Sequence, residues 1–391
     1  MANVSSSNGL EKRPKLRFPG FDEPWKETTL SAIFSKSTQK NADGHITNVI
    51  CNSAKLGLIP QREYFDKDIA NSDNTSGYYI IRQNDFVYNP RKSSDAPYGP
   101  ISSYKYAEDG IVSPLYLCFH AKDEINPLYY EWFFRSPAWH RYIYMSGDSG
   151  ARHDRVSIKD DTFFAMPINL PAEKEQSKIA LFLQSLDERI AAQEKLVASL
   201  KKYKRGAIAY ILSGKSNEFD AESTWRETTL ADLCCEFRSG RNISASLIHE
   251  TGDYPVYGGN GIRGYCDHYS HEGEYVVVGR QGALCGNVRL IQGQNYLSEH
   301  AIAVRANEKN DTKFLLYLLD FMNLGQYSDQ GAQPGLAVNK LLRLKCTVPE
   351  KKTQSKISSF LLTYDKEIAA QESLLYFLTD QRKAFLQQLF I

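Results

Sequence analysis

The 391-residue chain lacks the features that mark secreted and membrane proteins. No apolar run reaches the ~18 residues of a membrane-spanning helix, and the N-terminal segment has no signal-peptide core. The seven cysteines form no CxxC pair and no regular framework, which argues against a disulfide scaffold and against structural zinc. These absences predict a cytoplasmic protein with no membrane partner.

A large excess of one charge is also missing, because the net charge is only +1. DNA-binding proteins often carry a basic excess, so the charge balance alone gives no support for nucleic-acid binding. The charge could be segregated into a basic and an acidic face, or partner proteins could supply phosphate contacts. Composition leaves both open. The length exceeds what one core supports, about 250–300 residues, and therefore predicts at least two domains.

Motifs of common catalytic and cofactor sites are absent or incomplete. No Asn/Asp-Pro-Pro-Tyr/Phe motif for adenine methylation occurs, and the eight histidines form no HxxxH or HxH pair. The GxGxxG match at residues 259–264 is not followed by a helical pattern, so it predicts a hairpin or loop instead of a dinucleotide site. No metal, cofactor or catalytic residue is therefore assigned to this chain.

What the chain does contain is a long internal repeat. Residues 187–194 (DERIAAQE) recur as residues 365–372 (DKEIAAQE), and the Gln-Ser-Lys-Ile segment at 176–179 recurs at 354–357 in the same register. A second motif links residues 25–30 (WKETTL) to residues 225–230 (WRETTL). Two motifs recurring in the same order indicate a duplicated module with a pseudo-two-fold arrangement.

Each copy ends in a long helix with a seven-residue hydrophobic period, which is typical of a coiled coil. The seam of the first comprises Ile179, Leu183, Leu186, Ile190, Gln193, Val197, Leu200, Lys204, Ala207 and Ile211. The seam of the second comprises Ile357, Leu361, Tyr364, Ile368, Gln371, Leu375, Leu378, Arg382, Phe385 and Leu389. A core hairpin or a dimerising zipper would explain one helix. Two matched helices favour an intramolecular antiparallel pair, in which Gln193 and Gln371 could meet.

The predicted fold is α+β. Two α/β domains with curved β-sheets are separated by two long antiparallel coiled-coil helices with pseudo-two-fold symmetry. The boundaries are a tail at 1–23, a first variable domain at 24–171, a first spacer helix at 172–214, a linker at 215–223, a second variable domain at 224–349 and a second spacer helix at 350–391. Helices of about 36 residues at ~1.5 Å each would span ~54 Å, enough to address DNA sites one turn apart, ~34–36 Å.

Polar and basic residues gather in the glycine-rich loops of both variable domains, which also contain short helices expected at 127–142 and 312–322. Arg suits guanine and Asn or Gln suit adenine in the major groove, whereas Lys and flanking Arg more often bind phosphate. Solvated loop charge is the alternative for any single residue. The candidate DNA-binding residues are Asn89, Arg91, Lys92, Arg152, His153, Arg155, Asn260, Arg263, Tyr265, Arg280, Gln281 and Gln333.

Over essentially its whole length the layout resembles the specificity subunit of type I restriction-modification enzymes. The resemblance lies in the start at 14–25, in the segments at 86–91 and 110–114, in those at 254–261, 278–283 and 298–301, and in the two Gln-Ser-Lys-Ile motifs. It implies that the variable domains are target-recognition domains for the unlike halves of an interrupted, asymmetric DNA sequence.

The resemblance also implies partners. Two modification subunits would dock on the conserved regions and form an adenine methyltransferase, and two restriction subunits would add an ATP-dependent nuclease. S-adenosylmethionine, ATP and Mg²⁺ would then belong to those partners and not to this non-catalytic chain. Two other hypotheses stay open: a coiled-coil scaffold that holds two copies of a partner without binding DNA, and a standalone nuclease or methyltransferase with an unrecognised site.

Overall fold

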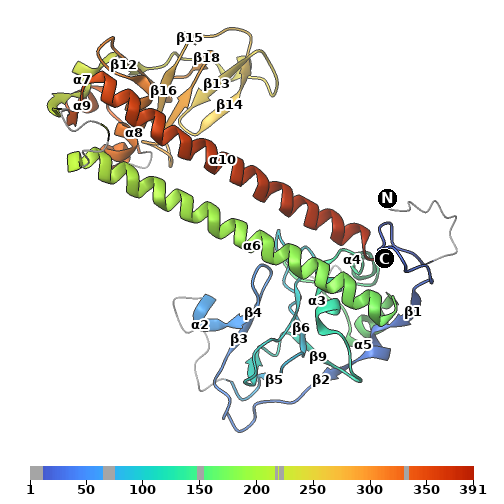
Figure 1. Cartoon of the computed structure of the whole chain (residues 1–391). Coiled ribbons are helices and arrows are strands. Elements are labelled where there is room, and N and C mark those ends of the chain that lie inside the picture. Colours follow the sequence, from blue (N-terminus) through green and yellow to red (C-terminus); the bar gives the residue numbers. More distant parts are fainter. Residues whose placement is uncertain (1–11, 65–74, 148–153, 216–218, 220–223, 330–333) are drawn as a thin grey trace. The chain divides into compact units, whose positions relative to one another are not determined.

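The computed structural model describes residues 12–64, 75–147, 154–215, 219, 224–329 and 334–391. The chain forms two compact units, one of residues 1–192 with 375–391 and one of residues 193–374. Each unit contains one variable domain and the adjoining parts of the two long helices, α6 (Glu173–Tyr210) and α10 (Lys351–Gln388) (Figure 1). The helices therefore belong to both units, whereas each domain belongs to one.

The domain of the first unit is built on antiparallel strands. Its four-stranded sheet has the order β2-β9-β6-β7, beside the pairs β1-β10, β3-β4 and β5-β8. The strands are β1 (Lys26–Thr29), β2 (Phe34–Ser37), β3 (Ile50–Ser53), β4 (Gly57–Pro60), β5 (Tyr79–Ile81), β6 (Phe86–Tyr88), β7 (Ile101–Ser103), β8 (Gly110–Val112), β9 (Leu117–Ala121) and β10 (Pro167–Leu170). The short helices are α1 (Leu30–Ile33), α2 (Gln61–Tyr64), α3 (Pro127–Arg135), α4 (His140–Ser146) and α5 (Asp160–Phe164).

The second domain repeats this plan with a different insert. Its sheet order β12-β19-β16-β17 and its pair β11-β20 match β2-β9-β6-β7 and β1-β10 of the first. A further sheet has the order β14-β13-β18-β15. The elements are β11 (Arg226–Thr229), α7 (Leu230–Leu233), β12 (Cys234–Ser239), β13 (Tyr254–Gly258), β14 (Gly261–Cys266), β15 (His271–Glu272), β16 (Tyr275–Gly279), β17 (Val288–Ile291), β18 (Gln294–Leu297), β19 (Ala301–Ala306), α8 (Thr312–Phe321), α9 (Val338–Leu342) and β20 (Lys345–Val348), with helical turns at Ala245–Leu247 and Leu324–Tyr327.

The sequence motifs fall where the duplicated plan needs them. The WKETTL and WRETTL segments form β1 and β11 and lead into α1 and α7. Phe18 packs edge-on against Phe182 in the first unit, and Phe219 packs in the same way against Phe360 in the second. The two units therefore share equivalent side-chain contacts as well as sequence motifs, and the predicted internal duplication is confirmed. The GxGxxG segment lies in the β13-β14 hairpin, as predicted.

The predicted coiled-coil seam is confirmed, because every seam residue of α6 and α10 is buried or half-buried. Within the first unit Phe182 contacts Phe385 and Asp187 pairs with Arg382; within the second, Lys201 pairs with Glu372 and Lys204 with Asp365. As residue numbers rise along one helix they fall along the other, so the helices run antiparallel in each unit.

Polar seam residues find partners in the opposite helix. Gln193 donates from Nε2 to Oε1 of Gln371 over 2.6 Å, as the repeat suggested. Lys204 and Arg382, which occupy equivalent seam positions, pair with Asp365 and Asp187. Polar groups in a seam cost stability unless they are matched, so these contacts favour one register over its neighbours.

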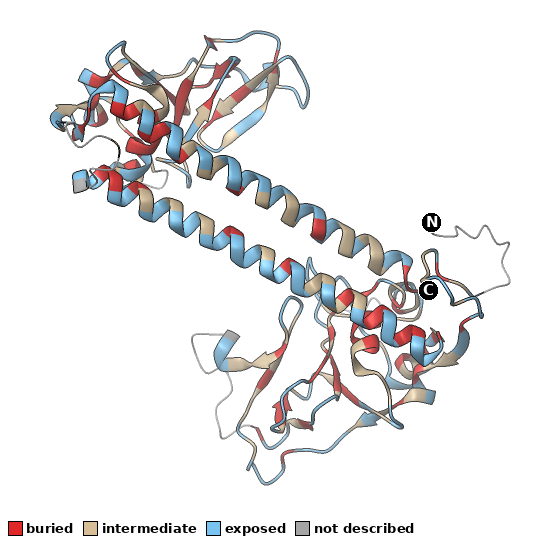
Figure 2. Ribbon diagram, in the orientation of Figure 1, coloured by how far each residue is buried: buried red, intermediate tan, exposed pale blue. Residues whose placement is uncertain are grey.

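The distal ends of the helices complete the domain cores. Leu389 and Phe390, just after α10, join the core of the first unit, and Ile211 and Leu212, just after α6, join that of the second. Figure 2 shows buried residues concentrated toward the N-terminal ends of both helices, while the middle of each is exposed except along the seam. A positive φ of 72° at Gly214 ends the α6 extension, a conformation that glycine adopts at little cost.

One expected helix is wrong in its extent. The helix predicted over 127–142 is two helices, α3 and α4, because Pro137 cannot donate a backbone hydrogen bond and disfavours helical geometry at Ser136. The helix expected at 312–322 is α8. Among the described residues, no helix is long and apolar enough to cross a membrane.

Candidate nucleic-acid interface

In the first domain, four predicted DNA-binding residues come together around a hollow of about 860 Å³. Asn89, Arg91, Lys92 and Arg155 line it, together with the hairpin of β3 and β4 and the turn before β9. Backbone contacts hold their two segments side by side. Arg91 and Arg155 form an isolated antiparallel β-bridge, and Lys92 N–H donates to the Asp154 carbonyl. Residues far apart in the chain are thus presented on one surface.

The charge around this hollow is predominantly positive. Lys55 joins Arg91, Lys92 and Arg155 along the lining, against one lining carboxylate, Asp95. Lys55, Arg91 and Lys92 are exposed, so their charges are available to a polyanion. Lys55 was not predicted, because its hairpin lies far from residues 89–92 in sequence. This surface is suited to phosphate contacts.

Asn89 has a different place from the one predicted for it. Its side-chain oxygen accepts from Arg91 N–H, and its Nδ2 lies 3.2 Å from the Asn52 carbonyl and 3.5 Å from the Tyr116 hydroxyl. The amide therefore ties three loops together, and its base contact stays a prediction. Only glycine fits at position 99, because a Cβ there would lie 2.1 Å from the Asn89 carbonyl oxygen.

In the second domain, glycines let several strand ends approach one another. A Cβ on Gly259 would lie 2.6 Å from the Gln281 carbonyl, and one on Gly279 would lie 2.5 Å from the Gly259 carbonyl. The β13-β14 hairpin turn and the loop after β16 are therefore in close contact. This brings together the predicted residues Asn260, Arg263, Arg280 and Gln281, of which all but the half-buried Arg280 are exposed.

Polar contacts orient part of this group. Gln281 Oε1 lies 2.6 Å from Nδ1 of His300, whose Nε2 lies 3.0 Å from Glu299. Arg280 donates to the Glu299 carbonyl at 3.3 Å. Gln281 is thus held by its neighbours, which reduces the entropy lost when an exposed side chain makes a specific contact.

Two arginines of this surface escaped sequence reasoning. The Arg289 guanidinium lies against Gly261 at the hairpin turn: a Cβ built on Gly261 would be 2.8 Å from Arg289 Nη1. Arg241 N–H donates to the Leu297 carbonyl, beside Ser298. Neither residue has a motif around it. Arg289 reaches the hairpin turn from β17, which belongs to a different sheet from β13 and β14, and an isolated β-bridge joins Arg241 to Ser298.

Of the remaining predicted residues, the structure describes only Tyr265. Tyr265 lies on β14 opposite Pro255 of β13, away from the hairpin turn. Arg152, His153 and Gln333 lie outside the described residues. The contacts of all four with DNA stay predictions.

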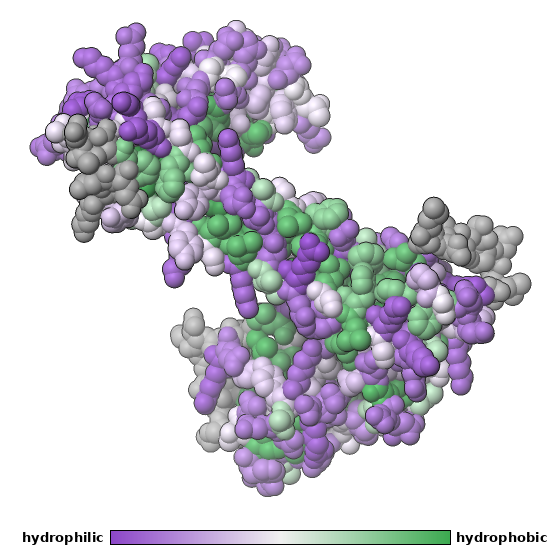
Figure 3. All heavy atoms as spheres, in the orientation of Figure 1, coloured by the Kyte–Doolittle hydropathy of each residue, from purple (hydrophilic) through white to green (hydrophobic). Residues whose placement is uncertain are grey.

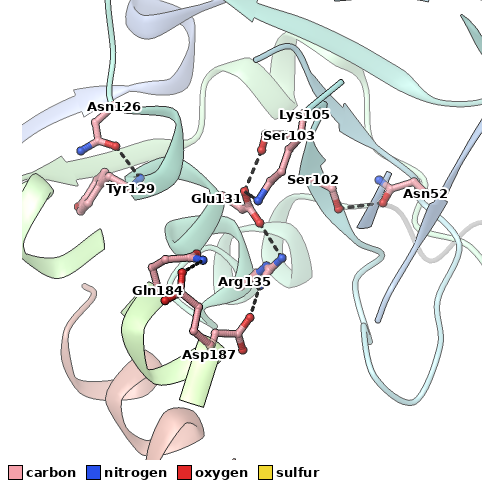
Figure 4. A network of polar contacts seen from close by, with 11 residues as sticks. Asn52, Ser102, Ser103, Lys105, Asn126, Tyr129, Glu131, Arg135, Gln184 and Asp187 are labelled. Carbon is pink, nitrogen blue, oxygen red and sulfur yellow. Dashed lines mark hydrogen bonds and ion pairs between the residues drawn. The ribbon is translucent and has the colours of Figure 1, made fainter. Parts of the chain in front are cut away.

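A chain of charged groups attaches the first domain to α6 (Figure 4). The buried Glu131 of α3 accepts from Ser103 at 2.9 Å and pairs with Lys105 at 2.8 Å and with Arg135 at 2.6 Å. Arg135 lies 3.6 Å from Asp187 of α6, and Asp187 also pairs with Arg382. A buried carboxylate is costly unless it is paired, so this network favours one orientation of the domain on its helix.

The second unit uses the equivalent carboxylate in the same way. Asp365 accepts from the Tyr317 hydroxyl of α8 at 2.6 Å and pairs with Lys204 of α6. Asp187 and Asp365 open the repeated octapeptide, and each bridges a seam cation and a domain helix. This explains why aspartate stands at both positions.

A buried histidine in the second domain joins two sheets. His271 Nε2 lies 3.3 Å from Glu236 of β12, and its Nδ1 lies 2.7 Å from Ser270. Burial lowers its pKa below the ordinary 6.5, outweighing Glu236, which acts in the opposite direction. Ser270 Oγ is already occupied as acceptor for Leu297 N–H, so the group is structural.

The stability of the second unit is expected to fall as the pH drops through 6.5. The folded His271 binds its proton less readily than the unfolded one, so below 6.5 the unfolded state takes up more protons. Amide hydrogen exchange in β16 would measure this at pH 7.5 and 5.5. The His271→Gln variant is the control: equal acid sensitivity in both proteins would contradict the assignment.

The comparisons with known proteins agree on one family. Residues 222–375 match the family model of the type I restriction modification DNA specificity domain. A type I restriction enzyme EcoprrI specificity subunit of Escherichia coli is 42% identical over 40% of this chain. A putative type I restriction enzyme specificity subunit of Haemophilus influenzae is 29% identical over 36%. These matches span only 38% and 37% of those two proteins.

Solved structures extend the likeness to the whole fold. The type I restriction-modification S subunit of M. genitalium superposes with a TM-score of 0.63 at 18% identity, covering 97% of this chain and 99% of that one. A chain from a structural study of type I system assembly and conformational transition gives 0.60 at 16% identity, covering 95% and 98%. The predicted fold class is confirmed. The matched domain at residues 222–375 and the curated relatives make the chain similar to type I restriction-modification specificity subunits.

Proposed function

We propose that this chain reads a bipartite, asymmetric DNA sequence, one half with each domain. The observation that carries the proposal is that each domain gathers cations and amides at its loop ends, with different residues in each. Arg91, Lys92 and Arg155 stand beside a hollow in the first, whereas Arg263, Arg289 and Gln281 surround a hairpin turn in the second. Similar scaffolds with unlike contact groups fit unlike half-sites.

The chain itself is proposed to be non-catalytic and to act in the cytoplasm. Two modification subunits would bind it and methylate adenine, and two restriction subunits would add DNA cleavage. S-adenosylmethionine, ATP and Mg²⁺ would be bound by those partners. Support comes from the curated relatives, which are specificity subunits of restriction enzymes, and from the related fold found in a study of complex assembly.

Genome-wide mapping of methylated adenines in cells with and without this chain tests the proposal. We expect an interrupted motif that disappears without the chain. Replacing residues 24–171 by the equivalent domain of a relative should change one half of the motif and leave the other. An unchanged motif would favour the scaffold alternative, and methylation or cleavage by the isolated chain would favour the enzyme alternative.

The surfaces proposed to bind the modification subunits are the exposed faces of the repeated octapeptides. Ala191, Ala192 and Glu194 are exposed in the first copy, and identical, exposed residues stand at 369, 370 and 372 in the second. Neighbouring exposed positions differ in charge, for example Glu188 and Lys366. Figure 3 shows further hydrophobic side chains at the surface of these helices, whose exposed members include Leu181 and Leu196. Ala191 and Ala369, like Ala192 and Ala370, are identical although they are exposed, which suggests one partner bound twice.

Large charged residues at these positions are expected to remove the partners one at a time. Ala191→Arg should leave about half of the bound modification subunit, and Ala191→Arg with Ala369→Arg should leave almost none, because a charge would be buried without a partner. Native mass spectrometry of the purified complex measures the occupancy. Glu188→Lys, which copies the residue at 366, is the control. Full occupancy in the double variant would contradict the assignment.

A further inference from the structure

Two leucines of the first domain are exposed beside the cationic hollow. Leu56 lies in the turn between β3 and β4 and Leu115 in the turn before β9, and 62% and 61% of their surfaces are accessible. Both line the hollow of about 860 Å³ with Lys55, Arg91 and Lys92. Large apolar side chains exposed on a common concave surface mark an interaction site more often than a solvated one.

The two turns do not need these leucines to hold their shape. Ser53 Oγ accepts from the backbone N–H groups of Lys55 at 3.3 Å and Leu56 at 3.4 Å. Ser113 Oγ accepts from Leu115 N–H at 3.3 Å in the same manner. Hydroxyl-capped turns of this kind are formed by the serine and the backbone. The side chains of Leu56 and Leu115 are therefore free for another contact.

The turns are also fixed relative to each other before anything binds. The Asn89 amide reaches both Asn52, at the base of the first turn, and Tyr116, at the end of the second. The buried Asn52 donates to Val87 at 2.8 Å and to Pro100 at 3.2 Å, and accepts from Ser102 at 2.8 Å. A site whose parts are already ordered loses less entropy on binding.

The surrounding charge identifies the occupant. Lys55, Arg91, Lys92 and Arg155 favour a polyanion, yet a leucine gains nothing from phosphate. A DNA duplex offers both chemistries in its major groove, where the thymine 5-methyl group is the exposed apolar feature between two phosphate backbones. We propose that Leu56 and Leu115 contact thymine methyl groups in one half-site and so determine its sequence. This rests on the proposed DNA-reading function.

The inference predicts a methyl-dependent specificity that is confined to one half-site. The full chain, assembled with its modification subunits, would select sequences from a randomised duplex pool. Wild type should enrich thymine in the half-site read by the first domain. Replacing those thymines by deoxyuridine should weaken binding about three- to fivefold per methyl group. The double variant Leu56→Ala, Leu115→Ala should show no thymine–uracil difference there and leave the other half-site unchanged.

Three controls separate this effect from a loss of folding or of charge. Met145→Ala removes an apolar side chain of the same domain with 72% of its surface exposed, on α4, and should retain the thymine–uracil difference. The salt dependence of binding should be unchanged in the double variant, because no cation is removed. Its thermal unfolding should also match wild type, since the serines hold both turns.

The outcomes also distinguish the inference from the function on which it rests. A wild-type complex that selects an interrupted motif but binds thymine and uracil duplexes equally overturns the inference alone. A double variant that keeps the wild-type thymine preference also overturns it. So does a double variant whose loss of affinity is the same for thymine and uracil duplexes, because that result would mean that the leucines insert between base pairs. A wild-type complex that selects no sequence overturns the proposed function and the inference together.

Discussion

Replacing Phe390 with alanine is expected to lower the free energy of unfolding of the first unit by about 3–5 kcal/mol. Phe390 is only 4% exposed, and its ring lies 5.7 Å from Tyr129 and 6.2 Å from Phe133 of α3, centroid to centroid. The chain end thus fills the core of the domain formed by the other end of the chain. Domains of this size are stable by about 5–15 kcal/mol, so such a cavity removes a large fraction of the stability.

Phe377→Ala is the matched control, because Phe377 lies in the same unit, on the helix that leads to Phe390, but is 56% exposed. Its effect should stay within about 0.5 kcal/mol. Urea unfolding followed by the fluorescence of Trp132 and Trp139, both in the core of the first unit, compares the two variants. Equal destabilisation by both substitutions would mean that the end of α10 does not complete this core.

The sequence was sufficient to predict the parts of the fold that depend on local periodicity. A heptad pattern specifies which face of a helix is buried, and the repetition of Gln193 in Gln371 was enough to suggest that the two amides meet. The break at Pro137 is also local, but the apolar run around it suggested one continuous helix. Aromatic side chains such as Trp132 and Trp139 face the same core from both helices, so the pattern continues across the break.

The candidate interface was less predictable because strand pairing assembles it. Arg91 and Arg155 were both named from sequence, but only the structure places them on one hollow with Lys55 and Leu56. Arg289 has no motif around it and reaches the hairpin turn of Arg263 from a strand of another sheet. Asn89 shows the opposite problem: its residue type suits adenine, yet its amide bonds with Asn52 and Tyr116 position loops.

Replacing Arg263 with alanine is expected to weaken binding of the cognate duplex by about 5- to 150-fold and to relax selectivity at one position of one half-site. Arg263 is the extra residue of a β-bulge, since Val256 pairs with Gly264 and Tyr257 with Ile262. A bulge redirects a side chain away from the regular alternation of a strand. The Arg263 side chain packs directly over Gly258, because a Cβ built on Gly258 would lie 2.6 Å from Arg263 Cδ. This packing restricts the direction of the side chain.

The salt dependence of affinity decides what this guanidinium does. If Arg263 reads a base, Arg263→Lys should fail to restore selectivity, because an ammonium cannot form the paired hydrogen bonds of a guanidinium. If it only neutralises a phosphate, Arg263→Lys should restore affinity, and Arg263→Ala should weaken all sequences alike and reduce the salt slope by about 0.9. Arg343→Ala, which removes an equally exposed charge at the end of α9, controls for net charge. A loss of affinity as large in that variant would show that the second domain depends on its overall charge, and the bulge would have no special part in recognition.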